Sequence, residues 1–149
     1  MLSCIDRFQN LYPVQRDSQE GDFEQRLIKY LDLTNEEFFY FQNGFIPKVV
    51  MVEWMDSIIE CLPIYHIDNQ EPLNYDLLDF REIHDRKLLQ KFPRLEIAMK
   101  VNGNYDFSVI ADRATSDSRR QRRELISEIL GNLNVKVKKS HFDKALLIV

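Results

Sequence analysis

The sequence predicts an α+β fold in which a mainly helical N-terminal half packs on a C-terminal ββαββ antiparallel sheet module. Three observations carry this prediction. Residues 48–61 are apolar on nearly every side, which is typical of a buried helix. Residues 94–101 alternate apolar and polar side chains, which is the period of a half-buried strand. The dipeptide Asn102-Gly103 follows directly, and it favours the tight turn of a β-hairpin.

Length and charge indicate one domain, residues 1–149, with two unlike halves. A chain of 149 residues with 44% hydrophobic and 30% charged residues is typical of a single folded domain. Residues 1–93 carry 9 Lys and Arg against 17 Asp and Glu, whereas residues 94–149 carry 11 against 7. The prediction is therefore an acidic, mainly helical half that attracts a basic ββαββ half within one fold. The alternative is that the division of charge marks an interaction surface.

The sequence indicates a cytoplasmic protein without a membrane segment. No apolar run approaches the roughly 18–20 residues that are needed to span a bilayer. Asp6 and Arg7 stand where a secretory signal peptide needs an apolar core. The two cysteines, Cys4 and Cys61, do not make a disulfide framework in a chain of this length, so both are expected to be reduced thiols.

Helical periodicity predicts the first elements of the acidic half. Apolar residues within 5–12 have the spacing of a short helix, and residues 22–33 form the next one. Thr34-Asn35-Glu36-Glu37 is a capping box, which opens a separate short helix. This helix is expected to end at Asn43-Gly44, because both residue types tolerate left-handed backbone angles.

Two longer helices complete this half. Pro47 fits the first turn of a helix over residues 48–61. That helix has one polar stripe, which is expected to face water and consists of Glu53, Asp56, Ser57 and Glu60. A further helix is expected over residues 75–91 and ends before Pro93, since the residue before a proline avoids helical angles.

The basic half is expected to fold as two strand pairs around one helix. The first pair joins residues 94–101 to residues 105–112, whose side chains also alternate. A helix over residues 118–130 follows and begins with the capping box Ser118-x-x-Gln121. This helix covers the apolar face of a four-stranded antiparallel sheet. The remaining two strands are residues 135–138 and 144–149.

Four arginines stand at the start of the helix over residues 118–130, and two of them point inward. On a helical wheel with about 100° per residue, Arg119 and Arg122 lie within roughly 40° of Ile126, which belongs to the buried stripe. Arg120 points away from this stripe. Positive side chains at the N-terminal end of a helix oppose its dipole, so the inward arginines need an anion nearby.

Two sources of that anion are open. The first is this chain, with Asp106, Asp112 or a carboxylate of the acidic half as the partner. The second is an external phosphate, nucleic acid or acidic peptide, which a helix N-terminus and bidentate arginines both suit. Under the second interpretation, Arg119, Arg122 and Arg123 are the candidate anion- or partner-binding residues.

No catalytic residue, metal ligand or cofactor is predicted. Cys61 and His66 lack a second pair of ligands at the spacing of a zinc site. The carboxylates of Glu53, Asp56 and Glu60 share a helix face that suits a divalent cation, but a solvated acidic stripe is the simpler interpretation. The sequence also contains no Gly-rich phosphate loop and no Gly-x-Ser-x-Gly elbow.

These observations favour a non-enzymatic interaction or regulatory module that acts through a protein partner or through self-association. The broad apolar surface of the helix over residues 48–61 suits an oligomer interface. The first alternative is a nucleic-acid- or phosphate-binding protein that uses the arginine-rich start of the helix over residues 118–130. The second alternative is a metal-dependent enzyme.

Overall fold

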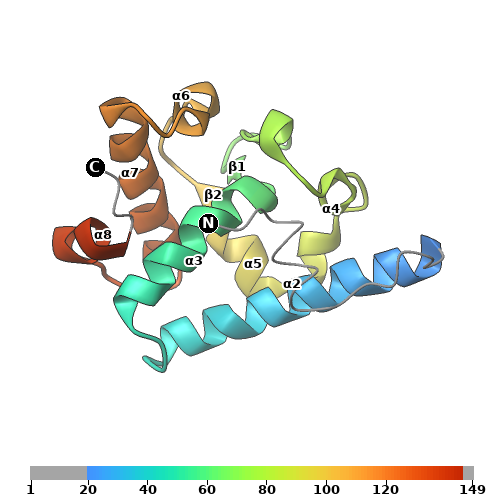
Figure 1. Cartoon of the computed structure of the whole chain (residues 1–149). Coiled ribbons are helices and arrows are strands. Elements are labelled where there is room, and N and C mark those ends of the chain that lie inside the picture. Colours follow the sequence, from blue (N-terminus) through green and yellow to red (C-terminus); the bar gives the residue numbers. More distant parts are fainter. Residues whose placement is uncertain (1–19, 146–149) are drawn as a thin grey trace.

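The computed structural model describes the backbone of residues 20–145 and the side chains of residues 23–145. The helix expected within residues 5–12 lies outside this range, as does most of the strand expected over residues 144–149. The described chain is mostly helical, and its helices surround one hydrophobic core (Figure 1). The long helices are α2 (Glu20–Gln42), α3 (Lys48–Cys61) and α7 (Ser116–Asn132).

A tight turn joins α2 to α3. It contains Gly44 at φ 73°, in the left-handed region that the sequence predicts for this helix end. Pro47 then precedes α3, and the bounds predicted for this helix, residues 48–61, are confirmed. In Figure 1, α2 runs along the lower edge of the molecule, and α3 rises from the turn through its middle.

The capping box over residues 34–37 does not begin a new helix. α2 continues through it, and the Thr34 hydroxyl donates a hydrogen bond to the Tyr30 carbonyl oxygen at 2.9 Å within the same helix. Thr34 is buried, as are Tyr30 and Phe38 on either side of it. Because the buried residues keep helical spacing across the box, the packing of one continuous face against the core outweighs the local capping preference.

The single helix expected over residues 75–91 is wrong. Lys87, at φ 54°, interrupts it with left-handed backbone angles. Apolar residues stand on both sides of the expected helix, and a straight helix leaves one of those sides in water. Breaking the helix lets both sets reach the core, since Leu78, Ile83 and Leu89 are all buried. The three short pieces are η1 (Tyr75–Leu77), α4 (Arg81–Asp85) and η2 (Leu88–Lys91).

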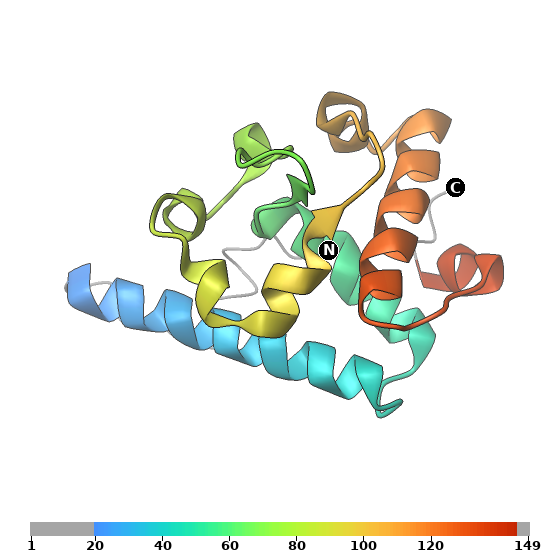
Figure 2. The same cartoon turned by 180° about the vertical axis from the view of Figure 1, so that it is seen from behind.

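The described residues contain no antiparallel ββαββ module, so the predicted α+β fold class is wrong. Their two strands, β1 (Tyr65–His66) and β2 (Lys100–Val101), are short and pair in parallel, with Tyr65 opposite Lys100. In Figure 2 the yellow α5 leads through the short arrow of β2 towards α6 at the top of the molecule. The helices that replace the expected strands are α5 (Pro93–Ala98), α6 (Phe107–Ala111) and α8 (Lys139–Ala145).

Residues 94–101 begin as a helix although their side chains alternate. Pro93 takes the first position of α5, where its missing N–H costs nothing. Leu95 and Met99 are buried four residues apart, as on one face of a helix. Ile97, which the strand pattern places in the core, is 60% exposed. The apolar residues of this segment fit both the two-residue period of a strand and the period of a helix. The helical conformation is the one that places Leu95 and Met99 in the core.

Asn102-Gly103 does not form the predicted hairpin turn, and neither residue has a positive φ. Their backbone amides instead donate to the carboxylate of Glu128 on α7, at 3.1 Å for Gly103. The Tyr105 hydroxyl donates to the same carboxylate at 2.7 Å. Burial and the hydrogen bond to Glu128 raise the pKa of Tyr105, so the hydroxyl remains a donor at neutral pH. The carboxylate of Glu128, which is distant in the sequence, thus binds the backbone amides that were expected to form a hairpin turn.

We expect Glu128→Ala to lower the free energy of unfolding by about 1–3 kcal/mol, because two amides and a hydroxyl lose their acceptor. Amide hydrogen exchange at Asn102 and Gly103, measured by NMR, should accelerate. Glu124→Ala is the matched control on the same helix, since Glu124 is exposed and pairs with Arg120 at 3.3 Å. A loss of stability no greater than that of the control contradicts the role assigned to Glu128.

The helix predicted over residues 118–130 is confirmed as α7, although its ends differ. Its N-cap is Thr115, whose hydroxyl oxygen accepts from the Ser118 amide at 3.1 Å. At the other end, Asn134 takes φ 62°, and the Val135 amide donates back to the Leu130 carbonyl oxygen at 2.8 Å. This Schellman ending turns Val135 onto the core, which is why the expected strand does not continue from here.

No helix in the described part of the chain is long and apolar enough to cross a membrane. Cys61, the last residue of α3, is disulfide-bonded, so the expectation of a reduced thiol at this position is wrong. Cys4 lies outside the described residues.

Candidate functional site

Arg122, one of the predicted anion-binding residues, is completely buried between α7 and α3. Its Nη1 donates to Asp56 Oδ1 at 2.7 Å, and its Nη2 donates to Glu60. Its Nε donates to the carbonyl oxygen of Ile110 at 3.1 Å. The inward direction predicted for Arg122 is therefore confirmed, and the anion that it meets comes from this chain.

A second arginine completes a cluster of four charged residues, Asp56, Glu60, Arg113 and Arg122, which we call the α3–α7 ion cluster. Arg113 donates from Nη1 to Asp56 Oδ2 at 2.8 Å and from Nη2 to Glu60 Oε1 at 2.9 Å. Burial works to lower the pKa of Arg113, but the hydrogen bond and charge of Asp56, together with Glu60, raise it on balance. Two carboxylates and two guanidinium groups balance in charge, and a buried ionic cluster requires such pairing.

The ion cluster corrects one expectation and adds one residue. The polar stripe of α3 was expected to face water, and this is wrong for Asp56, which is 0% exposed. Arg113 was not singled out, because it stands between α6 and α7 with no periodic pattern around it. The available indication was the pair Asp56 and Glu60, four residues apart on a mostly apolar helix, combined with an inward arginine elsewhere in the chain.

The three predicted anion-binding residues do not meet in one open site. Arg122 is enclosed by the ion cluster, Arg119 is half-buried, and Arg123 Nη2 lies 3.6 Å from Asp143 Oδ1 on α8. The start of α7 therefore presents its arginines in different directions. A binding role for these residues stays a prediction.

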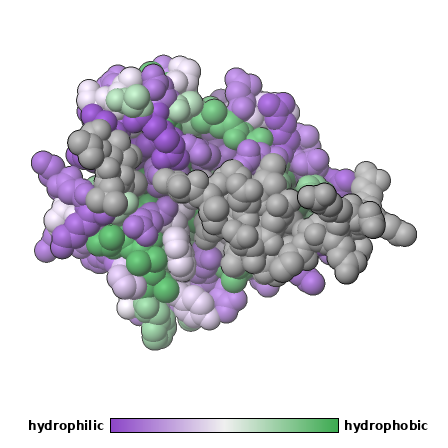
Figure 3. Space-filling view, in the orientation of Figure 1, coloured by the Kyte–Doolittle hydropathy of each residue, from purple (hydrophilic) through white to green (hydrophobic). Residues whose placement is uncertain are grey.

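Two exposed aromatic side chains and one half-buried aromatic side chain gather at the turn between α2 and α3. Phe39, Tyr40 and Phe45 form what we call the aromatic surface. The ring centroids are 5.7 Å apart for Phe39 and Tyr40 and 6.1 Å apart for Tyr40 and Phe45, and both pairs meet edge to face. Figure 3 shows hydrophobic atoms, coloured green, at the lower end of the molecule, where Figure 1 places this turn.

Polar contacts hold the rings of the aromatic surface in position. The guanidinium carbon of Arg94 lies 4.9 Å from the centroid of the Phe39 ring, and its Nε donates to Gln42 Oε1 at 2.9 Å. The Tyr40 hydroxyl donates to Glu36 at 2.6 Å, and this hydrogen bond raises the pKa of Tyr40. Arg94 thus covers part of the Phe39 ring and Glu36 holds the Tyr40 hydroxyl, while Phe39 and Phe45 stay exposed to solvent.

Within residues 20–145, no group of three or more His, Cys, Asp or Glu side chains is arranged to hold a metal ion. His66 and His141 are hydrogen-bonded to backbone groups of Asn102 and Lys138. The chain matches no protein-family model, and comparison with curated proteins and with solved structures gave no match.

Proposed function

We propose that the protein is a non-enzymatic interaction module that binds another protein, or a second copy of itself, through the aromatic surface. The observation that carries the proposal is Phe45, which is 70% exposed. Burying an exposed phenyl ring is favourable by about 1.5–3 kcal/mol, and aromatic residues are enriched in the cores of protein interfaces. The neighbouring rings of Phe39 and Tyr40 support a contact larger than one side chain.

The surroundings of Phe45 support an interface with an apolar centre and a polar rim. Three half-buried residues continue the apolar surface into the start of α3: Ile46, Val49 and Val50. Lys48 is exposed beside them, and Arg94 borders the ring of Phe39. These two positive groups favour a partner whose rim is acidic, since complementary potentials speed association and exclude other partners.

Nucleic-acid binding through the start of α7 has less support. Arg122 is paired with Asp56 and Glu60 in the core, so it reaches a phosphate only if the ion cluster breaks. Arg120, the exposed arginine of this group, has Asp117 within 2.7 Å. The metal-dependent enzyme has no supporting observation among the described residues.

The proposal also concerns the role, the oligomeric state and the cellular location of the protein. A regulatory role and a homo-oligomeric state are both compatible with docking through the aromatic surface. A cytoplasmic location is the prediction from the sequence, and the disulfide at Cys61 argues against it, because disulfides persist mainly in oxidising compartments.

We expect the wild-type chain to self-associate as its concentration rises, and Phe45→Ser to keep the monomer mass of 17.8 kDa, as measured by light scattering. Because Phe45 is largely exposed, Phe45→Ser should change the free energy of unfolding by less than about 0.5 kcal/mol. Phe23→Ser is the matched control, since Phe23 is an exposed phenylalanine in the first turns of α2, far along the helix from the aromatic surface. The control should associate like the wild type.

If the wild type remains at the monomer mass at every concentration, the partner is a different protein. That partner must be recovered with the wild type and with Phe23→Ser but lost with Phe45→Ser. The purified pair must then show the same difference in affinity by calorimetry. A monomeric wild type for which no partner depends on Phe45 contradicts the proposal.

A further inference from the structure

We propose that the surface of residues 136–144 binds the phosphate backbone of a nucleic-acid duplex, without regard to its base sequence. Four exposed lysines carry the proposal, and we call them the lysine surface: Lys136, Lys138, Lys139 and Lys144. They belong to the segment after α7 and to α8. The lysine surface shares no residue with the aromatic surface, so the two proposals are tested separately.

The lysine surface has no ion pair within the part of the chain that the structure describes. The arginines of α7 differ in this respect, because Arg120 and Arg122 each have a carboxylate within 2.7 Å. Four ammonium groups within nine residues repel one another, and no carboxylate of residues 23–145 pairs with them. The phosphates of a nucleic acid supply the missing negative charge.

The carboxylates nearest in the fold are engaged with other groups. Asp143, the only acidic residue of α8, lies 3.6 Å from Arg123. On α7, Glu124 pairs with Arg120 at 3.3 Å, and Glu128 accepts from the amides after β2 and from a tyrosine hydroxyl. The lysine surface therefore keeps its positive charge after the neighbouring carboxylates are taken into account.

The wider distribution of charge favours the same orientation towards a polyanion. α8 packs against α3, and Figures 1 and 2 both place it beside the first turns of that helix. The exposed charged residues of α3 are Lys48 and Glu53, whose charges offset each other. Residues 132–145 contain four lysines and one aspartate, which gives +3, so the rest of the chain carries −7 of the total −4. A polyanion repels that remainder and attracts the lysine surface.

The segment before α8 directs two of the lysines towards solvent. Val135 is buried and Val137 packs against the core, so Lys136 and Lys138, which alternate with them, point outward. The Lys138 amide donates to His141 Nδ1 at 2.9 Å, and the His141 amide donates back to the Lys138 carbonyl oxygen at 3.0 Å. These two bonds fix the segment to the first turn of α8.

α8 presents the other two lysines. Its buried residues, Phe142 and Ala145, face the core and leave Lys139 and Lys144 exposed. A helix of seven residues is about 10 Å long, and one strand of a duplex presents about three phosphates over that distance. The lysines can therefore contact separate phosphates at the same time.

The chemistry of this surface fits a nucleic acid better than a protein or a membrane. Within residues 132–145 every exposed side chain is polar, and Figure 3 shows hydrophilic atoms at the left edge, where Figure 1 places α8. A protein interface has an apolar centre, and a membrane-bound helix buries apolar side chains in the bilayer, whereas phosphates need only charge and donors. No aromatic ring in this segment is exposed for base stacking, which favours a duplex read through its backbone.

The probe is a fluorescein-labelled DNA duplex of mixed sequence, whose fluorescence anisotropy reports binding by the full chain. Affinity should fall as KCl rises, with a log–log slope of about −3.6, because each of four lysine–phosphate contacts contributes about −0.9. Lys138→Gln combined with Lys144→Gln should weaken binding and reduce the slope to about −1.8. A second duplex of different sequence should bind equally well.

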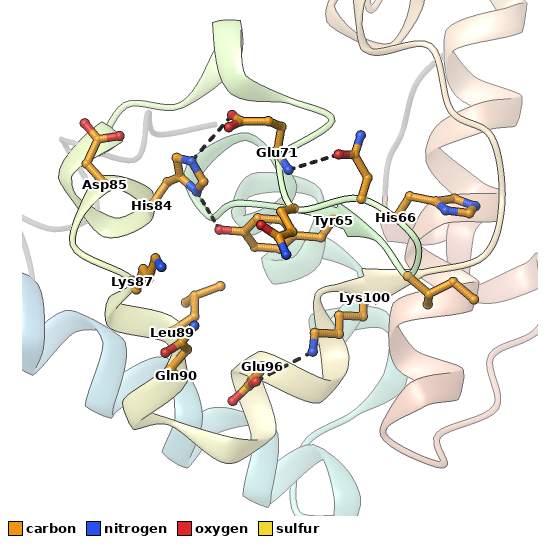
Figure 4. A pocket seen from close by; sticks show the side chains of 13 residues that line it. Tyr65, His66, Glu71, His84, Asp85, Lys87, Leu89, Gln90, Glu96 and Lys100 are labelled. Carbon is orange, nitrogen blue, oxygen red and sulfur yellow. Dashed lines mark hydrogen bonds and ion pairs between the residues drawn. The ribbon is translucent and has the colours of Figure 1, made fainter.

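Lys87→Gln combined with Lys100→Gln is the matched control, because it removes two exposed lysines elsewhere and changes the net charge equally. Figure 4 shows both lysines at a cavity of about 550 Å³ that three carboxylates also line, Glu71, Asp85 and Glu96. Lys100 lies 3.6 Å from Glu96. These surroundings do not attract a phosphate, so the control should keep the affinity and the slope of the wild type.

Equal losses of affinity in the two double variants overturn the proposal, because the net charge of the chain then governs the attraction. Polyglutamate that binds as tightly as the duplex also overturns it and indicates an acidic protein as the partner. The same holds for vesicles of phosphatidylcholine and phosphatidylserine, which indicate a membrane. A wild type that does not bind the duplex at low salt overturns it as well. All substituted lysines are exposed, so both variants should keep the circular dichroism spectrum of the wild type.

Discussion

Replacing Arg122 by methionine is expected to lower the free energy of unfolding by about 3–5 kcal/mol. The change leaves the buried carboxylate of Asp56 with Arg113 as its remaining charged partner. It also removes the donor to the Ile110 carbonyl oxygen. A buried charge without sufficient compensation costs more than the apolar contacts that methionine regains. Urea unfolding followed by circular dichroism measures the loss.

Arg120→Met is the matched control for this experiment. Arg120 is exposed on the same helix and pairs with Asp117 and Glu124, so its replacement should cost less than about 1 kcal/mol. Combining Arg122→Met with Asp56→Leu should recover part of the loss, because the double variant no longer buries a poorly paired carboxylate. An effect of Arg122→Met as small as that of the control contradicts a stabilising role for the ion cluster.

Replacing Asn74 by alanine is expected to cost about 2–4 kcal/mol. The Asn74 side-chain amide donates to the carbonyl oxygens of Ile59 at 2.9 Å and Leu62 at 2.8 Å. Its Oδ1 accepts from the Ile64 amide at 3.0 Å. Because Asn74 is buried, alanine leaves three backbone groups at the end of α3 without partners and without access to bulk water. Thermal and urea unfolding measure the effect.

Asn104→Ala is the control for Asn74, since Asn104 is exposed and its loss should stay within about 0.5 kcal/mol. Hydrogen exchange at the Ile64 amide should accelerate in the Asn74 variant and not in the control. If Asn74→Ala lowers the free energy of unfolding by less than about 1 kcal/mol, water replaces the side-chain amide. The hydrogen bonds of Asn74 are then not what holds the end of α3 in place.

Two of the three long helices, α3 and α7, were predictable from the sequence, whereas α2 was expected as two separate helices and the short helices were not predicted with their bounds. α3 and α7 are long enough for the 3.6-residue period of their apolar side chains to repeat. Gly44 and Pro47 mark the end of α2 and the start of α3, because both residue types have strong local backbone preferences. Residues 94–101 are too few to separate a period of two from a helical one. Which of their side chains face the core depends on the elements that pack against them. The exposure of Ile97 shows that the helical pattern prevails over the strand pattern.

The candidate sites were predictable only in part. The direction of Arg122 followed from a helical wheel, but its partners did not, since the sole polar stripe of an apolar helix is normally assigned to water. Phe39 and Phe45 carry no mark in the sequence that separates them from core phenylalanines. Their exposure depends on how α2 turns into α3 and on which helices cover that end of the core.

By itself the sequence determined the turn at Gly44, the helices α3 and α7, and the inward direction of Arg122. Caps, turns and periodicity act between residues a few positions apart, so they can be read locally. The tertiary structure alone decided the parallel pairing of β1 with β2, the capture of the Asn102 and Gly103 amides by Glu128, and the ion cluster. These contacts join distant parts of the chain, and their strength depends on burial that exists only after the helices have packed.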